Sequence, residues 1–243
     1  MSINRRRFLG LSGAAVAATA LAPGLRLIEL AQARSPEEAA TSLHRWGLLI
    51  DSSKCANGCT SCVSACADEN GIQGHGRPAT DAQWIRKVTL KDKQTGHVQT
   101  LPLMCLHCEH PPCVDVCPTG ASFKRADGIV LVDKHICIGC RYCMMACPYQ
   151  ARSFVHEVTT GQKAHAPRGK GTVESCTLCV HKVDRGDGST ACADACQKDG
   201  HRAILFGDLK DPNSAISKRL ATQPSAQLRA DLKLNTGVRY QGI

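Results

Sequence analysis

Sixteen cysteines, arranged in four sets of four, constrain this chain more than any other feature of its sequence. In chain order the sets are Cys55, Cys59, Cys62, Cys66; Cys105, Cys108, Cys113, Cys117; Cys137, Cys140, Cys143, Cys147; and Cys176, Cys179, Cys192, Cys196. The third set has the spacing C-x2-C-x2-C-x3-C and precedes Pro148, which is the bacterial ferredoxin spacing for a [4Fe–4S] cluster. Four sets of four thiolates predict four such clusters, and a row of clusters conducts electrons.

The spacing has a physical reason. Three thiolates separated by two residues lie on one tight loop, where they can hold three irons of one cube while backbone N–H groups stabilise its negative charge. The fourth cysteine follows on a short helical turn and, in two-cluster ferredoxins, reaches across to the other cluster. A proline after it, as at Pro118 and Pro148, turns the chain away because it donates no N–H and restricts the preceding residue.

The other three sets are less regular and are supported by their repetition. Three residues separate Cys55 from Cys59, four separate Cys108 from Cys113, and twelve separate Cys179 from Cys192. The first and last sets also lack the proline after their fourth cysteine.

Other uses of cysteine fit this pattern less well. An exported cysteine-rich chain can build a disulfide framework, but disulfides require neither quartets nor a Cys-Pro ending. Structural zinc normally takes two separated C-x2-C pairs rather than four cysteines within one short segment. Haem c attachment is disfavoured because Val180, not histidine, follows the pair Cys176 and Cys179.

Residues 1–33 have the features of a twin-arginine signal peptide. Adjacent arginines at 5–7 precede Phe8 and Leu9, an apolar stretch runs over 9–22, and an A-x-A cleavage site ends at Ala33. Fourteen apolar or small residues are too few for a membrane anchor. The twin-arginine route exports folded proteins, which suits clusters assembled before export, so we expect a periplasmic mature chain at 34–243 that attaches to the membrane only through a partner.

The positive charge of the chain requires no nucleic acid to explain it. Residues 1–33 contain four arginines and Glu29, so they carry +3 of the formal charge of +9 and leave +6 for the mature chain. Each oxidised cluster with its four thiolates carries about −2, so four add about −8. Aromatic residues make up only 4% of the chain. We therefore expect the clusters to act as cores and the cluster-free chain to be largely disordered.

Hydrophobic patterns and turn residues predict short elements around the cysteine sets. Alternation on either side of Gly96 predicts a β-hairpin over 84–91 and 97–104, inserted between the first two sets. The glycine-rich segment 164–172 favours a plain loop over a phosphate-binding one. Further predictions are strands at 46–51, 129–133, 153–157 and 203–206, a surface helix at 213–223, and an extended tail up to Ile243 that lies over a partner rather than in the core.

Several of these segments resemble one known protein family. The segments 113–121 (CVDVCPTGA) and 137–149 (CIGCRYCMMACPY), with 206–209 (FGDL) and 211–214 (DPNS), are similar to four-cluster iron–sulfur subunits of polysulfide, dimethyl sulfoxide and formate-dependent nitrite reductase systems. The resemblance covers residues 46–220.

A narrower resemblance is to the exported iron–sulfur subunit (DsrO type) of the dissimilatory sulfite reductase-linked DsrMKJOP membrane complex. It is carried by the segments 141–145 (RYCMM) and 167–171 (PRGKG).

The resemblance implies an α+β fold of two ferredoxin-like [4Fe–4S] halves, with a β-hairpin insertion. The outer half comprises 46–70 and 172–207, the inner half 100–157, and the tail 208–243 binds a partner. It also implies that the sets exchange ligands, with clusters held by Cys55, Cys59, Cys62 and Cys196; by Cys66, Cys176, Cys179 and Cys192; by Cys105, Cys108, Cys113 and Cys147; and by Cys117, Cys137, Cys140 and Cys143. The histidines near the cysteines are expected to support the clusters or lie at the surface rather than bind iron; they are His107, His110, His181 and His201.

The implied function is electron transfer without catalysis, since the sequence shows no group of residues typical of nucleophilic or general acid–base catalysis. The resemblance implies a polytopic membrane subunit that interacts with quinones and a periplasmic haem c protein as partners, in sulfur metabolism. A molybdopterin catalytic subunit, as in polysulfide, dimethyl sulfoxide or nitrite reductases, is the alternative periplasmic partner. A metal-binding scaffold that carries no electrons is a further alternative.

Overall fold

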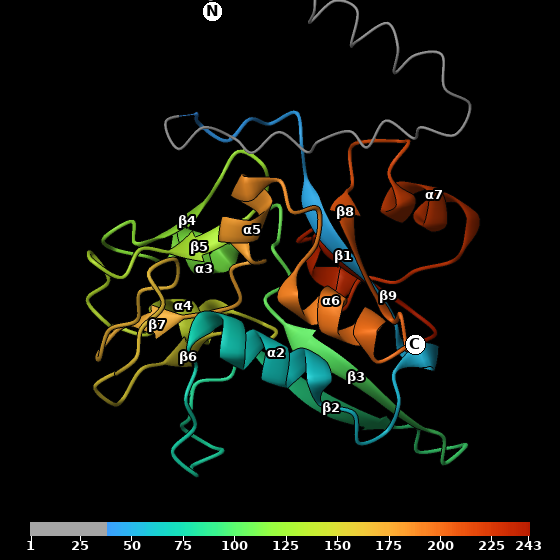
Figure 1. Ribbon diagram of the computed structural model, residues 1–243, viewed down its shortest axis with the longest axis horizontal. Coiled ribbons are helices and arrows are strands. Elements are labelled where there is room, and N and C mark those ends of the chain that lie inside the picture. The colour runs from blue at the N-terminus through green and yellow to red at the C-terminus, as the bar shows by residue number, and fades with distance from the viewer. Residues whose placement is uncertain (1–37) are drawn as a thin grey trace, which may run out of the picture. The chain divides into compact units, whose positions relative to one another are not determined.

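The computed structural model describes residues 38–243 (Figure 1). The predicted signal peptide at 1–33 lies outside the described residues, so twin-arginine export stays a prediction. No helix within residues 38–243 combines the length and the apolar character that crossing a bilayer requires.

A three-stranded sheet has β1 (Trp46–Asp51) at its centre, as Figure 1 shows. Strand β8 (Ile204–Asp208) pairs with it antiparallel, and β9 (Val238–Gln241) pairs with it parallel. The run WGLLID is nearly all apolar because both faces of β1 are covered, and Leu48 and Ile50 are buried. The predicted strand at 46–51 is confirmed.

The C-terminal segment corrects the prediction that the tail stays outside the core. Val238 and Tyr240 of β9 are fully buried, and the Tyr240 hydroxyl donates to the carbonyl of Pro102 at 3.0 Å. Before β9 come α7 (Ala215–Thr222), close to the predicted helix, and the 3-10 turn η2 (Ala230–Leu232). The tail is therefore a structural part of the sheet, and its binding to a partner stays a prediction.

The predicted hairpin is confirmed as β2 (Ile85–Lys91) and β3 (Val98–Met104), which pair antiparallel with Ile85 opposite Met104. At the turn, Gly96 takes the left-handed conformation, and Asp92 accepts hydrogen bonds from the backbone N–H groups of Gln94 and Thr95. The end of the hairpin next to the cysteines is buried and its tip is exposed.

The remaining elements are short and form two helix pairs. Helix α2 (Ser61–Asn70) packs on α6 (Ala191–Lys198), and α3 (Pro112–Asp115) packs on α4 (Tyr142–Ala146). Two small hairpins and two helical turns complete the fold: β4 (Ser122–Lys124) with β5 (Val130–Val132), β6 (Ser153–Phe154) with β7 (Val173–Glu174), η1 (Ser52–Lys54) and α5 (Val180–Arg185). The α+β class is confirmed, with the strands predicted at 129–133 and 153–157 shortened to β5 and β6.

The loop over 164–172 is anchored by a buried ion pair. Arg168 donates through Nε and Nη2 to the Glu174 carboxylate at 2.9 and 2.8 Å, and through Nη1 to the Gly71 carbonyl at 2.9 Å. These contacts tie the loop to the end of α2.

Candidate iron–sulfur sites

The first site combines three early cysteines with one late cysteine. Cys55, Cys59, Cys62 and Cys196 line one cavity. The packing of α2 on α6 brings Cys196 to the first set, and the extra residue between Cys55 and Cys59 leaves both at the cavity. Lys87 of β2 donates to Cys55 Sγ at 2.8 Å, so a positive charge lies at the rim of this site.

The second site lies on the same helix pair, and all four of its cysteines are buried. Cys66, Cys176, Cys179 and Cys192 line one cavity with apolar neighbours that include Leu178. The backbone at Leu178 and Cys179 is left-handed, and the N–H of Leu178 donates to Cys176 Sγ at 3.4 Å. The backbone thus bends around the cavity, and the N–H of Leu178 points at a cysteine sulfur.

The third site surrounds the regular cysteine motif and opens to the surface. Cys117, Cys137, Cys140 and Cys143 line one cavity. Among the sixteen cysteines, all of them in the described residues, Cys140 alone is exposed. Gly139 is left-handed, and a Cβ there would collide with the Gly171 carbonyl. That residue must therefore be glycine for Cys140 to reach the site.

Backbone donors also stabilise the charged form of Cys117 in this site. Burial acts to raise the pKa of Cys117, but hydrogen bonds from Ser122 and Thr119 outweigh it and lower that pKa. The Ser122 N–H lies 3.3 Å from Cys117 Sγ, and the Val173 N–H lies 3.4 Å from Cys137 Sγ.

The electrostatics of the remaining four cysteines show that they lie together. Burial raises the pKa of Cys105 and of Cys108 to about 12, and in both cases Cys113 and Cys147 add to the rise. Cys147 comes directly after α4, whose packing on α3 brings it to the set that precedes it. The structure thus gathers the cysteines into the four groups implied by the resemblance, and their role as ligands of shared clusters stays a prediction.

Arg152 lies between the third site and this fourth group. Its Nη2 donates to Cys113 Sγ at 3.0 Å, whereas its buried Nε and Nη1 have no hydrogen-bond partner among residues 38–243. Burial acts to lower the pKa of Arg152, but Cys113, Cys105 and Cys143 outweigh it and raise that pKa. An unpaired buried donor is costly, and sulfur-rich anionic groups on both sides would supply the acceptors that Nε and Nη1 lack.

The buried thiols fit a soft metal centre better than a set of free cysteines. Burial raises the pKa of Cys66, Cys176 and Cys192, so each thiolate is costly unless a cation neutralises it. Four thiolates around one dry cavity are the donor set of an iron–sulfur cluster or of zinc.

The histidines near the cysteines have different surroundings. His107 is buried and its Nδ1 accepts from the Val130 N–H at 3.0 Å, while burial lowers its pKa to about 3. His110 is exposed, His201 lines the first cavity, and His181 contacts Glu69.

Two residues that contact cysteine sulfurs, Lys87 and Arg152, were not predicted from the sequence. Their cysteines lie 32 and 39 positions away in the chain, so no local motif links them.

Comparison with known families identifies the metal group. The family described as "4Fe-4S dicluster domain" matches residues 54–121 in one form and residues 96–208 in another. Together the matched residues include all sixteen cysteines. Two dicluster domains and sixteen cysteines account for four [4Fe–4S] clusters, which sets aside the zinc and disulfide alternatives.

Similar proteins are iron–sulfur and reductase subunits. The chain is 42% identical to the Hdr-like menaquinol oxidoreductase iron-sulfur subunit 1 of Archaeoglobus fulgidus, over 98% of this chain and 97% of that protein. It is 39% identical to a tetrathionate reductase subunit of Salmonella typhimurium, over 90% of this chain and 80% of that protein. It is 37% identical to protein NrfC of Escherichia coli, over 77% and 76% of the two chains.

Proposed function

Because the chain belongs to the family of four-cluster iron–sulfur electron-transfer subunits, we propose that it relays electrons between a membrane quinone-interacting subunit and a periplasmic redox partner in sulfur metabolism. The observation that carries this proposal is the interleaving of the cysteine sets, because each half of the fold exchanges one cysteine between its two sites. Such an exchange keeps neighbouring clusters close, as a relay requires.

We assign the ligands by the cavities and the electrostatic contacts. The outer sites take Cys55, Cys59, Cys62 and Cys196, and Cys66, Cys176, Cys179 and Cys192. The inner sites take Cys105, Cys108, Cys113 and Cys147, and Cys117, Cys137, Cys140 and Cys143. Within each half the sites are neighbours, since Cys62 raises the pKa of Cys192 and Cys143 raises that of Cys113, both secondary to burial.

A [4Fe–4S] cluster bound at such a site takes up and releases one electron at a time. The chain sets the ease of that step through charge and hydrogen bonding to sulfur. Lys87 beside Cys55 and Arg152 beside Cys113 place positive charge where an added electron resides. Backbone N–H groups that donate to cysteine sulfur, such as that of Ala203 at 3.2 Å from Cys196 Sγ, also stabilise the added negative charge.

The face around Cys140 is the proposed contact for a redox partner. Ile138, Tyr142 and Met145 flank this cysteine and are 67%, 54% and 73% exposed. Exposed apolar patches of this kind mark interaction surfaces. A cluster ligand that reaches the surface within such a patch shortens the path of an electron to a docked protein.

The similar proteins support a quinol-linked complex more strongly than a reductase. The menaquinol oxidoreductase subunit of Archaeoglobus fulgidus matches this chain over nearly its whole length. The tetrathionate reductase subunit of Salmonella typhimurium matches slightly less of this chain. It supports a second candidate function, in which the chain delivers electrons to a molybdopterin reductase. Location in the periplasm rests on the twin-arginine features of residues 1–33.

Anaerobic affinity purification of the chain from native membranes, with mass spectrometry and haem staining of what copurifies, tests this proposal. A polytopic membrane subunit together with a haem c protein is the expected result. A large molybdenum-containing subunit would move the assignment to a reductase, and recovery of the chain without any redox or membrane subunit would contradict the proposal.

A further inference from the structure

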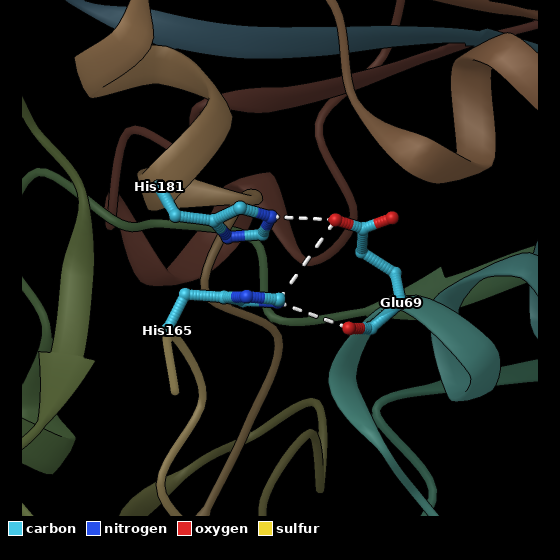
Figure 2. Close-up of side chains that lie close together, drawn as sticks. All are labelled: Glu69, His165 and His181. Carbon is cyan, nitrogen blue, oxygen red and sulfur yellow. Dashed lines mark hydrogen bonds and ion pairs between the residues drawn. The ribbon is translucent and has the colours of Figure 1, made fainter. Parts of the chain in front are cut away.

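Three metal-ligating side chains meet outside the cysteine sites: Glu69, His165 and His181 (Figure 2). Glu69 is on the last turn of α2, His181 is on α5, and His165 is on the loop between β6 and β7. The two histidines lie 96 and 112 positions from Glu69 in the chain. Their meeting is therefore a product of the tertiary fold.

The geometry of the three side chains is compact. His181 Nε2 lies 2.7 Å and His165 Nε2 lies 3.9 Å from the same oxygen, Glu69 Oε1. The two imidazole rings are stacked with centroids 3.8 Å apart. Figure 2 shows both Nε2 edges turned toward Glu69. The carbonyl oxygen of Glu69 adds a further oxygen atom 3.0 Å from His165 Nε2.

The fold holds these residues in place and leaves one side of the group open. The Arg168 guanidinium binds the Gly71 carbonyl and the buried Glu174 carboxylate, which fixes the His165 loop against the end of α2. The His181 side chain is mostly buried, whereas the side chains of Glu69 and His165 are 31% and 30% exposed. Two sides of the group are thus anchored while one remains open to water.

The charges around the group are compatible with a cation. The hydrogen bond from His181 outweighs burial and holds the pKa of Glu69 below its usual value, so the carboxylate is charged at neutral pH. The neighbouring cations of α5 are already paired, Lys182 with Asp194 at 2.6 Å and Arg185 with Asp187 at 2.8 Å.

We propose that Glu69, His165 and His181 bind one Zn²⁺ ion through two imidazole nitrogens and a carboxylate oxygen, with the fourth position open to water. Two histidines and a glutamate are an established zinc donor set. Tetrahedral coordination with bonds of about 2.0–2.1 Å places ligand atoms about 3.3 Å apart. The distances of 2.7 and 3.9 Å from Glu69 Oε1 lie on either side of that value, and one of the two stacked rings must rotate for both nitrogens to face the same ion.

Zinc titration of the anaerobically purified holoprotein, after a mild chelator has removed loosely bound ions, tests this site. Calorimetry should find one zinc ion bound per chain while the iron content stays unchanged. His165→Ala and Glu69→Gln should each weaken binding by at least about tenfold, the lower end of what removing even a supporting residue costs. His97→Ala, which changes an exposed histidine at the tip of the β2–β3 hairpin, should leave the affinity unchanged.

X-ray absorption at the zinc edge gives a second readout that needs no variant. The proposal predicts nitrogen and oxygen scatterers at about 2.0–2.2 Å and no sulfur. Sulfur at about 2.3 Å would show that zinc had replaced iron in a cysteine set and would overturn the proposal. Equal zinc affinity in the wild type and both ligand variants would overturn it as well.

Discussion

Arg152 donates a hydrogen bond from Nη2 to Cys113 Sγ at 3.0 Å, while its buried Nε and Nη1 find no acceptor in the described part of the chain. The guanidinium lies between the two inner cysteine groups, near Cys105, Cys113 and Cys143. A permanent cation in this position favours the reduced form of both inner clusters. It is therefore the strongest candidate for tuning the inner half of the relay.

Replacing Arg152 tests this tuning. Arg152→Gln should make the reduction potential of at least one inner cluster more negative by up to about 130 mV, since a hydrogen bond to a charged group contributes about 1.5–3 kcal/mol and a tenfold change, about 1.4 kcal/mol, equals about 59 mV for one electron. Arg152→Lys keeps the charge and should give a smaller shift. Redox titration followed by paramagnetic resonance measures both, with the exposed Arg229→Gln as control.

Lys87 makes a corresponding contact in the outer half, where its Nζ lies 2.8 Å from Cys55 Sγ. Lys87→Met should make the potential of the first outer cluster more negative by up to about 130 mV, the shift that loss of one charged hydrogen bond of about 1.5–3 kcal/mol gives. Lys91→Met changes an exposed lysine on the same strand and should have no effect. Equal potentials in the two variants would show that Lys87 does not influence the cluster.

A charge on the Cys140 face should slow electron transfer to the redox partner. Met145→Glu should lower the second-order rate by about tenfold, as expected for an interface residue that contributes about 1–2 kcal/mol, while the cluster spectra stay the same. Val158→Glu introduces the same charge at a residue that is equally apolar and 70% exposed, outside this patch. Stopped-flow reduction compares them, and an equal loss of rate in both variants would rule out docking at this face.

The burial of Tyr240 predicts that the C-terminal strand stabilises the whole fold. Tyr240→Ala should destabilise the holoprotein by about 3–5 kcal/mol, as for other large buried side chains. Tyr240→Phe, which removes only the hydrogen bond to Pro102, should cost about 1 kcal/mol. Absorbance measures cluster loss at increasing guanidinium concentration and so ranks the variants by stability. Ile243→Ala, at the exposed chain end, should behave as wild type.

Removal of the clusters should unfold much of the chain. The thiols of Cys66, Cys176 and Cys192 are buried beside one another, and burial raises their pKa. Without clusters the core is thin, since only 4% of residues are aromatic. Circular dichroism should show a large loss of structure after oxidative cluster removal. Retention of the full spectrum by iron-free protein would contradict this expectation.

Local sequence patterns predicted the elements that depend on neighbours in the chain. The apolar run 46–51 and the alternation on either side of Gly96 indicated a strand and a hairpin that the structure contains. Strand β9 was missed because the four residues VRYQ contain only two apolar side chains, Val238 and Tyr240, too short a pattern to separate from a polar tail.

Contacts between distant residues could not be predicted in this way. Arg152 and Lys87 have no motif that links them to their cysteines, and His165 meets Glu69 only because a loop and a helix end are tied together through Arg168. The ferredoxin spacing predicted that a fourth cysteine reaches across to another cluster, but the family resemblance was needed to say which sets exchange their cysteines. Tertiary packing of α2 on α6 and of α3 on α4 brings the exchanged cysteines together.

Quantitative iron and acid-labile sulfide analysis of the anaerobic holoprotein, with Mössbauer spectroscopy, tests the central claim most directly. We expect four irons and four sulfides at each of four sites, all of cubane type and all reducible by one electron. Iron sufficient for fewer than four clusters, or zinc in place of iron at a cysteine set, would contradict a four-cluster relay.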